Sequence, residues 1–398
     1  MKFNLIAIIL VSIFQLNYAQ IADKNLIKAG MLVHLELYDQ ALEAANQSQS
    51  SDDKFYPVIM AEINFGIKDF SKALEFYKEA ENNFSGEFHL EKAKCFAMLG
   101  NKNLAFENLS EYIKTKNKLP VSKIANDAAF QSLKDNLNWG KLWQNADYSD
   151  LEIKINQTEA SLAAGYQNNF PVLDEALKKY PNNPELLYQQ ARYLSGMKLY
   201  DAALKSINQA ITRKPGMDKY QFQKAEVLLK LQNFKDALVA INNAISKNPF
   251  SHEYYIIRID INQNLGNSEK SAEDMALLEY SLPDNPNVKL AKVQMQYDNG
   301  NYLQALNGLN DLIRKDQSQP VYYILRGKIG LKAERIQLAD EDFGMALDLN
   351  PIDADANLGK GMARFKMQDN TSACYYWQKA THQGSREAKE NLIKYCKN

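Results

Sequence analysis

The chain has 398 residues, of which 45% are hydrophobic and 24% are charged, a composition that is typical of folded proteins and argues against global disorder. Its 47 basic and 48 acidic residues give a formal charge of −1, which removes the electrostatic basis for binding nucleic acid. Four His and three Cys are too few for a metal-rich or disulfide-dense scaffold. Gly and Pro are also scarce, which argues against short strands joined by tight turns.

Residues 1–19 have the pattern of a secretory signal peptide. One positive charge at Lys2 precedes an apolar stretch from Leu5 to Phe14, and the small residue Ala19 closes the segment. The stretch is shorter than the roughly 20 residues that span a bilayer. The alternative is a first core helix, but polar residues interrupt the apolar face just before Ala19. We therefore expect cleavage near Ala19 and an exported product, periplasmic or secreted, with no transmembrane segment.

Small residues recur at a regular interval in the next segment, residues 20–115. One series is Ala29, Ala61 and Ala93, and a second series, with the same interval, is Ala41, Ala73 and Ala105. A small residue at a fixed period is typical of repeated helical pairs that approach closely. The pattern predicts an N-terminal array of about three helical hairpins.

Residues 116–149 break the repeat and predict an irregular helical connector. Trp139 and Trp143 are four residues apart and would share one helix face. They could form an aromatic shelf for a ligand, or they could plug the core between two arrays. We favour the second interpretation, because aromatic pairs at helical spacing are usually buried.

A 34-residue period governs residues 150–383 and predicts about seven further hairpins. It appears in several independent series, which include Ala203, Ala237, Ser271, Ala305, Ala339 and Ala373, and also Pro181, Pro215, Pro249, Pro283 and Pro351, with Gln317 in place of Pro between the last two. In one repeat, Asn233 can cap the helix that Phe234 opens, and Pro249 stops it. Ala225 and Ala237 would lie where the two antiparallel helices approach closely.

The period and these residue types resemble the tetratricopeptide repeat (TPR). The resemblance implies an all-α fold: an α-solenoid of tandem antiparallel hairpins, a TPR-like superhelix. Residues 384–398 lack a partner hairpin and predict a C-terminal capping helix. Cys374 and Cys396 lie at equal distances from the Gly384–Ser385 turn, which would bring them side by side. A disulfide between them and two separate buried thiols both remain open.

Catalytic chemistry is not apparent in the sequence. No phosphate-binding glycine loop, nucleophile motif or metal-ligand spacing occurs, so we expect no enzyme activity, cofactor or metal. The acidic run from Asp340 to Asp342 is interpreted as a solvated helix face. Three Tyr pairs could each expose one ring or bury both, and these are Tyr254–Tyr255, Tyr322–Tyr323 and Tyr375–Tyr376.

The resemblance implies a concave groove that the first helix of each repeat lines. In this register the groove-facing candidates are Tyr188, Arg192, Phe222, Glu226, Ile256, Asp260, Gln294, Tyr297, Ile324 and Lys328. They mix apolar, acidic and basic types, so the basic clamp by which some tetratricopeptide grooves hold a carboxylate is not expected. An exported scaffold that binds a protein or peptide in this groove is the favoured function. The alternatives are an envelope-assembly or glycan-associated module at the outer membrane, and an enzyme with a site in residues 116–149.

Overall fold

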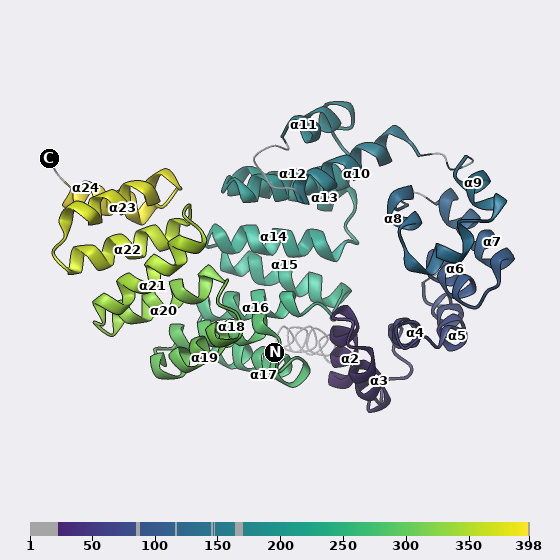
Figure 1. Ribbon diagram of the computed structural model, residues 1–398, viewed down its shortest axis with the longest axis horizontal. Coiled ribbons are helices and arrows are strands. Elements are labelled where there is room, and N and C mark those ends of the chain that lie inside the picture. The colour runs from purple at the N-terminus through teal and green to yellow at the C-terminus, as the bar shows by residue number, and fades with distance from the viewer. Residues whose placement is uncertain are drawn as a thin grey trace, which may run out of the picture. The chain divides into compact units, whose positions relative to one another are not determined.

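The computed structural model of the chain describes residues 23–84, 88–115, 118–144, 146, 148–163 and 170–396. The predicted signal peptide, residues 1–19, lies outside these ranges. Every regular element in the described residues is a helix and none is a strand, which confirms the all-α prediction (Figure 1). Among the described helices, none has the length and apolar character that a bilayer crossing requires.

The chain divides into two compact units, Met1–Leu282 and Pro283–Asn398. The boundary falls inside the predicted second array, residues 150–383, so the compact units differ from the arrays that the repeat register defines. The repeat register depends only on the sequence within each hairpin. The division into compact units also depends on which hairpins contact one another in space. The two units are described separately below.

The first unit begins with three helical hairpins and a connector. The hairpins are α2 (Lys24–His34) with α3 (Tyr38–Asn46), α4 (Tyr56–Gly66) with α5 (Phe70–Ala80), and α6 (His89–Met98) with α7 (Lys102–Lys114). The connector contains α8 (Val121–Ala125), the 3₁₀ helix η1 (Ala128–Leu133) and α9 (Leu137–Gln144). Four hairpins follow: α10 (Asp150–Ala163) with α11 (Phe170–Lys179), α12 (Pro184–Gly196) with α13 (Tyr200–Arg213), α14 (Asp218–Lys230) with α15 (Phe234–Lys247), and α16 (His252–Asn264) with α17 (Ser268–Ser281).

The second unit contains three hairpins and a last helix. They are α18 (Pro286–Asp298) with α19 (Tyr302–Lys315), α20 (Pro320–Lys332) with α21 (Ile336–Leu349), α22 (Ala354–Lys366) with α23 (Asn370–His382), and finally α24 (Arg386–Tyr395). The last helix packs on α23, as expected of a cap. Its N-cap is Ser385, whose hydroxyl accepts a hydrogen bond from the Ala388 backbone N–H at 3.2 Å.

Small residues allow the two helices of each hairpin to pack closely. Between α14 and α15, Ala225 and Ala237 have no exposed surface, and Asn233 caps α15 as predicted. In the second unit, Gly327 and Gly361 replace alanine because aromatic rings occupy the space. A Cβ at Gly327 would lie 2.9 Å from the Phe343 ring, and one at Gly361 would lie 2.5 Å from Trp377.

The turn between the helices of a hairpin repeatedly uses a left-handed residue. Gly100, Gly266 and Gly300 have φ values of +75° to +77° at this position. Elsewhere a residue with a side chain adopts the same conformation, as Gln232 does with φ of +59°. This is the αL ending of a helix, which favours Gly because an L side chain is strained there.

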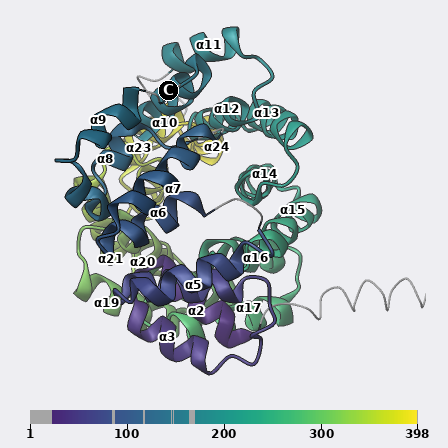
Figure 2. The ribbon, with the colours of Figure 1, turned by 90° about the vertical axis from the view of Figure 1, so that its right-hand side faces the viewer.

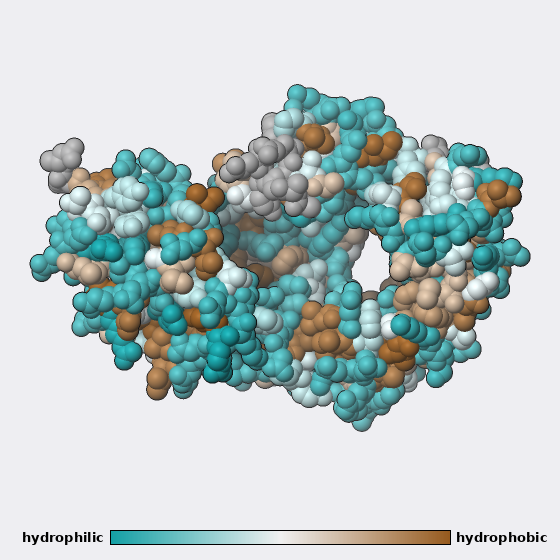
Figure 3. Space-filling model, viewed as in Figure 1, coloured by the Kyte–Doolittle hydropathy of each residue, from teal (hydrophilic) through white to brown (hydrophobic). Residues whose placement is uncertain are grey.

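Contacts between distant repeats close the first unit on itself, with α2 packed beside α17 (Figure 2). The Tyr280 hydroxyl lies 2.6 Å from the Asn25 side-chain oxygen, and the Lys28 ammonium lies 4.5 Å from the centroid of the same ring. The rings of Phe55 and Phe250 meet edge to face at 5.2 Å. The space-filling view shows an opening through this unit (Figure 3). The 34-residue period predicts contacts between neighbouring repeats only, so the sequence does not predict this closure.

Trp139 and Trp143 pack against the core of the connector. Their rings meet edge to face at 5.1 Å, and both rings lie against the buried cluster that contains Phe130 and Leu142. This packing favours the core interpretation over a ligand shelf.

The prediction that Asp340 to Asp342 form a solvated face is wrong for two of the three residues. Asp342 is buried, and its two carboxylate oxygens accept three hydrogen bonds from the Arg326 guanidinium, at 2.7–3.1 Å. Asp340 is buried between Lys360 and Arg364, at 3.1 and 2.8 Å. Only Glu341 is exposed. The two aspartates are buried because α21 packs between α20 and α22, and each of these helices supplies a cation.

The structure joins Cys374 and Cys396, with their Cα atoms 5.8 Å apart. The bridge links the first half of α23 to the residue that follows α24. Cys95 is a free, buried thiol.

Replacement of Ala237 by Leu should lower the free energy of unfolding by about 1–3 kcal/mol, because the buried hairpin contact has no room for a larger side chain. Denaturant unfolding of the whole chain measures the change. Ala202, which is exposed on α13, provides the matched Ala→Leu control. Equal stability of the two variants would show that the helices do not approach closely at Ala237.

Replacement of Gly266 by Ala should cost about 1 kcal/mol of stability, because a methyl group is strained at positive φ. Gly216→Ala is the control. At both glycines the space that a Cβ would occupy is open, with no non-neighbouring atom within 4 Å, and only Gly266 has positive φ. A loss of stability in both variants, or in neither, would contradict the left-handed turn as the cause.

Thiol counting on the denatured, unreduced protein should find one free thiol, that of Cys95, because the other two cysteines are bridged. After reduction the count should rise to all three cysteines. Three reactive thiols before reduction would show that the bridge does not form.

Candidate functional site

The first helices α12, α14 and α16 carry rows of stacked aromatic rings. Tyr188 of α12 packs against Tyr220 of α14 with ring centroids 5.1 Å apart. Phe222 of α14 stacks on Tyr254 of α16 at 4.7 Å with an interplanar angle of 30°. Both predicted aromatic groove residues of this unit are therefore held by a ring from a neighbouring repeat. Because these side chains already have little conformational freedom, binding a partner would cost less side-chain entropy.

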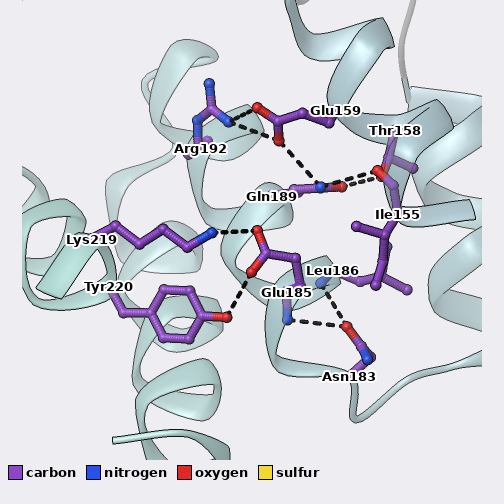
Figure 4. Close-up of polar contacts among 10 residues, drawn as sticks. All are labelled: Ile155, Thr158, Glu159, Asn183, Glu185, Leu186, Gln189, Arg192, Lys219 and Tyr220. Carbon is purple, nitrogen blue, oxygen red and sulfur yellow. Dashed lines mark hydrogen bonds and ion pairs between the residues drawn. The ribbon is translucent and has the colours of Figure 1, made fainter. Parts of the chain in front are cut away.

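Two cations flank the Tyr188 ring, and a carboxylate holds each of them. The Arg192 guanidinium lies 5.6 Å from the ring centroid and donates to both oxygens of Glu159 at 3.0 and 3.2 Å. The Lys219 ammonium lies 4.9 Å from the same centroid and 2.7 Å from Glu185. Figure 4 shows these pairs side by side, with the Tyr220 hydroxyl donating to the other oxygen of Glu185. Cation–π contacts and ion pairs thus fix the charged groups around one aromatic surface.

These residues border a cleft of about 530 Å³ between α10, α12 and the start of α14. We call it the α12 cleft. Its lining residues are Lys118, Glu152, Ile155, Asn156, Glu159, Asn183, Pro184, Glu185, Tyr188, Gln189, Arg192, Lys214, Met217, Lys219 and Tyr220. Three acidic and four basic side chains nearly balance, so the cleft favours a ligand with little net charge or with both signs of charge.

A polar network fixes the floor of the α12 cleft. Gln189 has no exposed surface, and its side-chain amide donates to Glu159 at 3.2 Å and to the Ile155 carbonyl at 3.3 Å. Its amide oxygen accepts a hydrogen bond from the Thr158 hydroxyl (Figure 4). Lys118 and Glu152 form a buried ion pair of 2.9 Å at the other side of the cleft. Satisfied buried networks of this kind make a site rigid.

Burial perturbs the acid–base behaviour of the predicted site residues. It raises the pKa of Tyr188 to about 12, so this phenol is neutral at physiological pH. It also raises the pKa of Glu226, whose carboxylate lies within the electrostatic reach of Lys230 and Arg192. The structure therefore brings Tyr188, Arg192 and Glu226 together.

The remaining candidates of the first unit lie on α16. Ile256 is half-buried, and Asp260 is exposed and accepts a hydrogen bond from Asn264 at 2.8 Å.

The four candidates in the second unit have different surroundings from one another. Gln294 is exposed and donates to Asp298, and Lys328 pairs with Asp355 at 2.9 Å. Tyr297 packs on Tyr302. Ile324 does not face a groove: it is only 7% exposed and belongs to the buried cluster of Phe343 and Ala356. The register placed it on the groove side, but side chains of α21 and α22 enclose it.

The Tyr pairs also differ from one another. Both rings of Tyr254–Tyr255 and of Tyr322–Tyr323 are buried, whereas Tyr375 is 53% exposed. Only the last pair presents a ring to solvent, so partner contact through exposed tyrosine pairs is limited to α23.

The acidic half of the α12 cleft was not predicted from the sequence. Glu159 and Glu185 were not among the candidates, although Glu185 pairs with Lys219, which lies one repeat period later in the chain. The pair Lys118 and Glu152 has the same separation. Opposite charges one period apart are the signal that could have identified these residues.

Among the described residues, no group of His, Cys, Asp and Glu could hold a metal ion. A second cavity, of about 650 Å³, lies beside the connector and is lined by apolar residues of α7 and by Lys114, Lys118 and Lys141. Glu107 and Ser110 of α7 also line this cavity, and the alternative hypothesis of an enzyme site in residues 116–149 stays a prediction.

Comparison with known proteins supports the fold. A sequence model of the ChAPs family (Chs5p-Arf1p-binding proteins) matches residues 168–338, less than half of the chain. A comparison with curated proteins found no significant sequence match.

Solved structures similar to this chain are helical-repeat assemblies. A tetratricopeptide repeat protein from Parabacteroides merdae has a TM-score of 0.51 at 18% identity, over 62% of this chain and 99% of the other. The APC/C Cut9–Hcn1 hetero-tetramer matches at 0.51 and 13%, over 92% and 82%. Human IFIT1 in complex with m7Gppp-AAAA matches at 0.52 and 14%, over 94% and 86%. At these identities the similarity establishes the fold. Together with the 34-residue register, it shows that the chain has a tetratricopeptide-repeat-like solenoid fold.

Proposed function

We propose that the chain is an exported, non-catalytic scaffold that binds a protein or peptide partner on the first-helix face of α12, α14 and α16. The observation that carries the proposal is the Tyr188 surface, where a packed aromatic ring lies between two cations that are already held by carboxylates. Tyr and Arg are the residue types that contribute most binding energy at protein interfaces.

The arrangement suits binding more than chemistry. Each lining carboxylate that flanks Tyr188 is neutralised by a cation, so neither is a free general base. Tyr188 and Phe222 each pack against a ring of a neighbouring repeat, which lowers the side-chain entropy lost when a partner binds. The α12 cleft carries both signs of charge, so we expect a partner segment that offers apolar or aromatic groups together with both acidic and basic side chains.

The location of this function rests on the pattern of residues 1–19, which is that of a secretory signal peptide. We propose that the protein acts after export, in the periplasm or outside the cell.

Affinity capture from the exported fraction, followed by mass spectrometry, tests the proposal. A tagged whole chain should retain a partner, and the double change Tyr188→Ala with Phe222→Ala should reduce retention about tenfold or more, because two packed aromatic contacts are lost. Circular dichroism should confirm that this variant is still helical.

The matched control is Lys235→Ala with Lys247→Ala, two exposed changes on the second helix α15. This variant should retain the partner as the unchanged chain does. Retention that is insensitive to the Tyr188 and Phe222 changes, or that is lost in the lysine variant, would contradict the assignment of the binding face.

A further inference from the structure

The second helix α21 has an apolar outer face. Leu338, Met345 and Leu349 are 53%, 46% and 42% exposed, and their spacings of seven and four residues place them on one side of the helix. Ile352, in the turn that follows, is 71% exposed. We call these four residues the α21 stripe. Exposed apolar patches that are rimmed by polar residues are typical of interaction sites.

The packing of the second unit does not require this stripe. A different side of α21 already supplies the core, with Ala339, Phe343 and Ala346 fully buried. Asp340 and Asp342 fix the helix to its neighbours through the ion pairs described above.

The neighbouring repeats provide an internal comparison for Leu338, Met345 and Leu349. The positions one period earlier are Gln304, Asp311 and Lys315 of α19, and the positions one period later are Ser372 and Lys379 of α23 and Gln383 at its end. All six are polar, and the three on α19 are exposed. The repeat architecture therefore places polar residues here, and α21 departs from it.

Acidic side chains border the α21 stripe. Glu341 and Asp348 are exposed and lie three residues after Leu338 and Met345, so they run parallel to the stripe along one edge. Glu334, in the preceding turn, is also exposed. The helix itself contains no Lys or Arg, and Arg335 at its N-cap is the nearest base in the sequence.

We propose that the α21 stripe docks a basic amphipathic helix of a partner protein. An apolar face that fits the stripe would bring flanking Lys or Arg side chains against Glu341 and Asp348, which gives the contact its specificity. Charge disfavours the other occupants. In a symmetric contact with a second copy of this chain the acidic edges would be close together, and an anionic lipid surface would repel them.

A fluorescence anisotropy titration of the whole chain tests the proposal. The probe is a labelled amphipathic helical peptide with a leucine face flanked by lysines, and the matched peptide carries glutamates in place of the lysines. The lysine peptide should bind at least tenfold more tightly than the glutamate peptide. The double change Leu338→Gln with Met345→Gln should weaken it at least tenfold, and so should Glu341→Gln with Asp348→Asn.

Leu303→Gln is the control, since Leu303 is a single exposed leucine on α19 of the same unit, 73% exposed. It should leave the affinity unchanged, and so should Tyr188→Ala with Phe222→Ala, which separates this site from the function proposed above. Equal binding of the two peptides, or insensitivity to the α21 changes, would overturn the proposal. Two further results would overturn the proposal. The first is that the chain binds phosphatidylglycerol vesicles and Leu338→Gln with Met345→Gln abolishes this binding. The second is that the chain self-associates and the same double change abolishes the self-association.

Discussion

The close contact between the two helices of each hairpin is the constraint on which the rest of the structure depends. Alanines at one register, from Ala203 to Ala373, are fully buried, and a larger residue there would separate the helices. On the first helices, the register that holds Ala191 and Ala225 holds glycine at Gly327 and Gly361, and an aromatic ring from the second helix fills the space there. Because this contact is made inside every hairpin, the remaining sides of the helices are left for neighbouring repeats and for partners.

Because the hairpin contact uses only one side of each helix, the other sides can carry surfaces of different chemical character on one chain. The first helices α12 and α14 carry aromatic rings and paired charges, which suit a partner that offers mixed chemistry. The outer side of α21 carries leucines beside exposed acidic positions, which suit a basic helix. The α21 stripe lies outside the buried cluster of its hairpin, so its residues could vary without loss of the fold.

The sequence predicted the fold because its signal repeats. The 34-residue period identified the hairpins and the small residues at the helix contact, and the segment after the last hairpin, residues 384–398, predicted the C-terminal capping helix. The period did not predict that α2 packs on α17, because that contact joins repeats far apart in the chain. The sequence also misplaced Asp340 and Asp342, since the cations that pair with them lie on the flanking helices and not on α21.

The candidate site was predicted in part. Register placed Tyr188 and Arg192 on the groove side of α12, and both line the α12 cleft in the structure. Glu159, which holds Arg192, lies on α10, where the repeat pattern is weak. Ile324 has the same register as Tyr188 and is nevertheless buried. The register determines only the side of the helix on which a residue lies, and the neighbouring side chains determine whether that side is exposed to solvent. Pairs of opposite charge one period apart, such as Glu185 and Lys219, would have supplied the missing half of the site.

Hydrogen–deuterium exchange of the whole chain, with and without the captured partner, tests the central claim most directly. If the first-helix face binds the partner, amides of α12, α14 and α16 and of the segment around Lys214 and Lys219 should exchange more slowly in the complex, while those of α13 and α15 should be unchanged. Slower exchange confined to α13 and α15 would place the partner on the opposite side of the repeats and contradict the account.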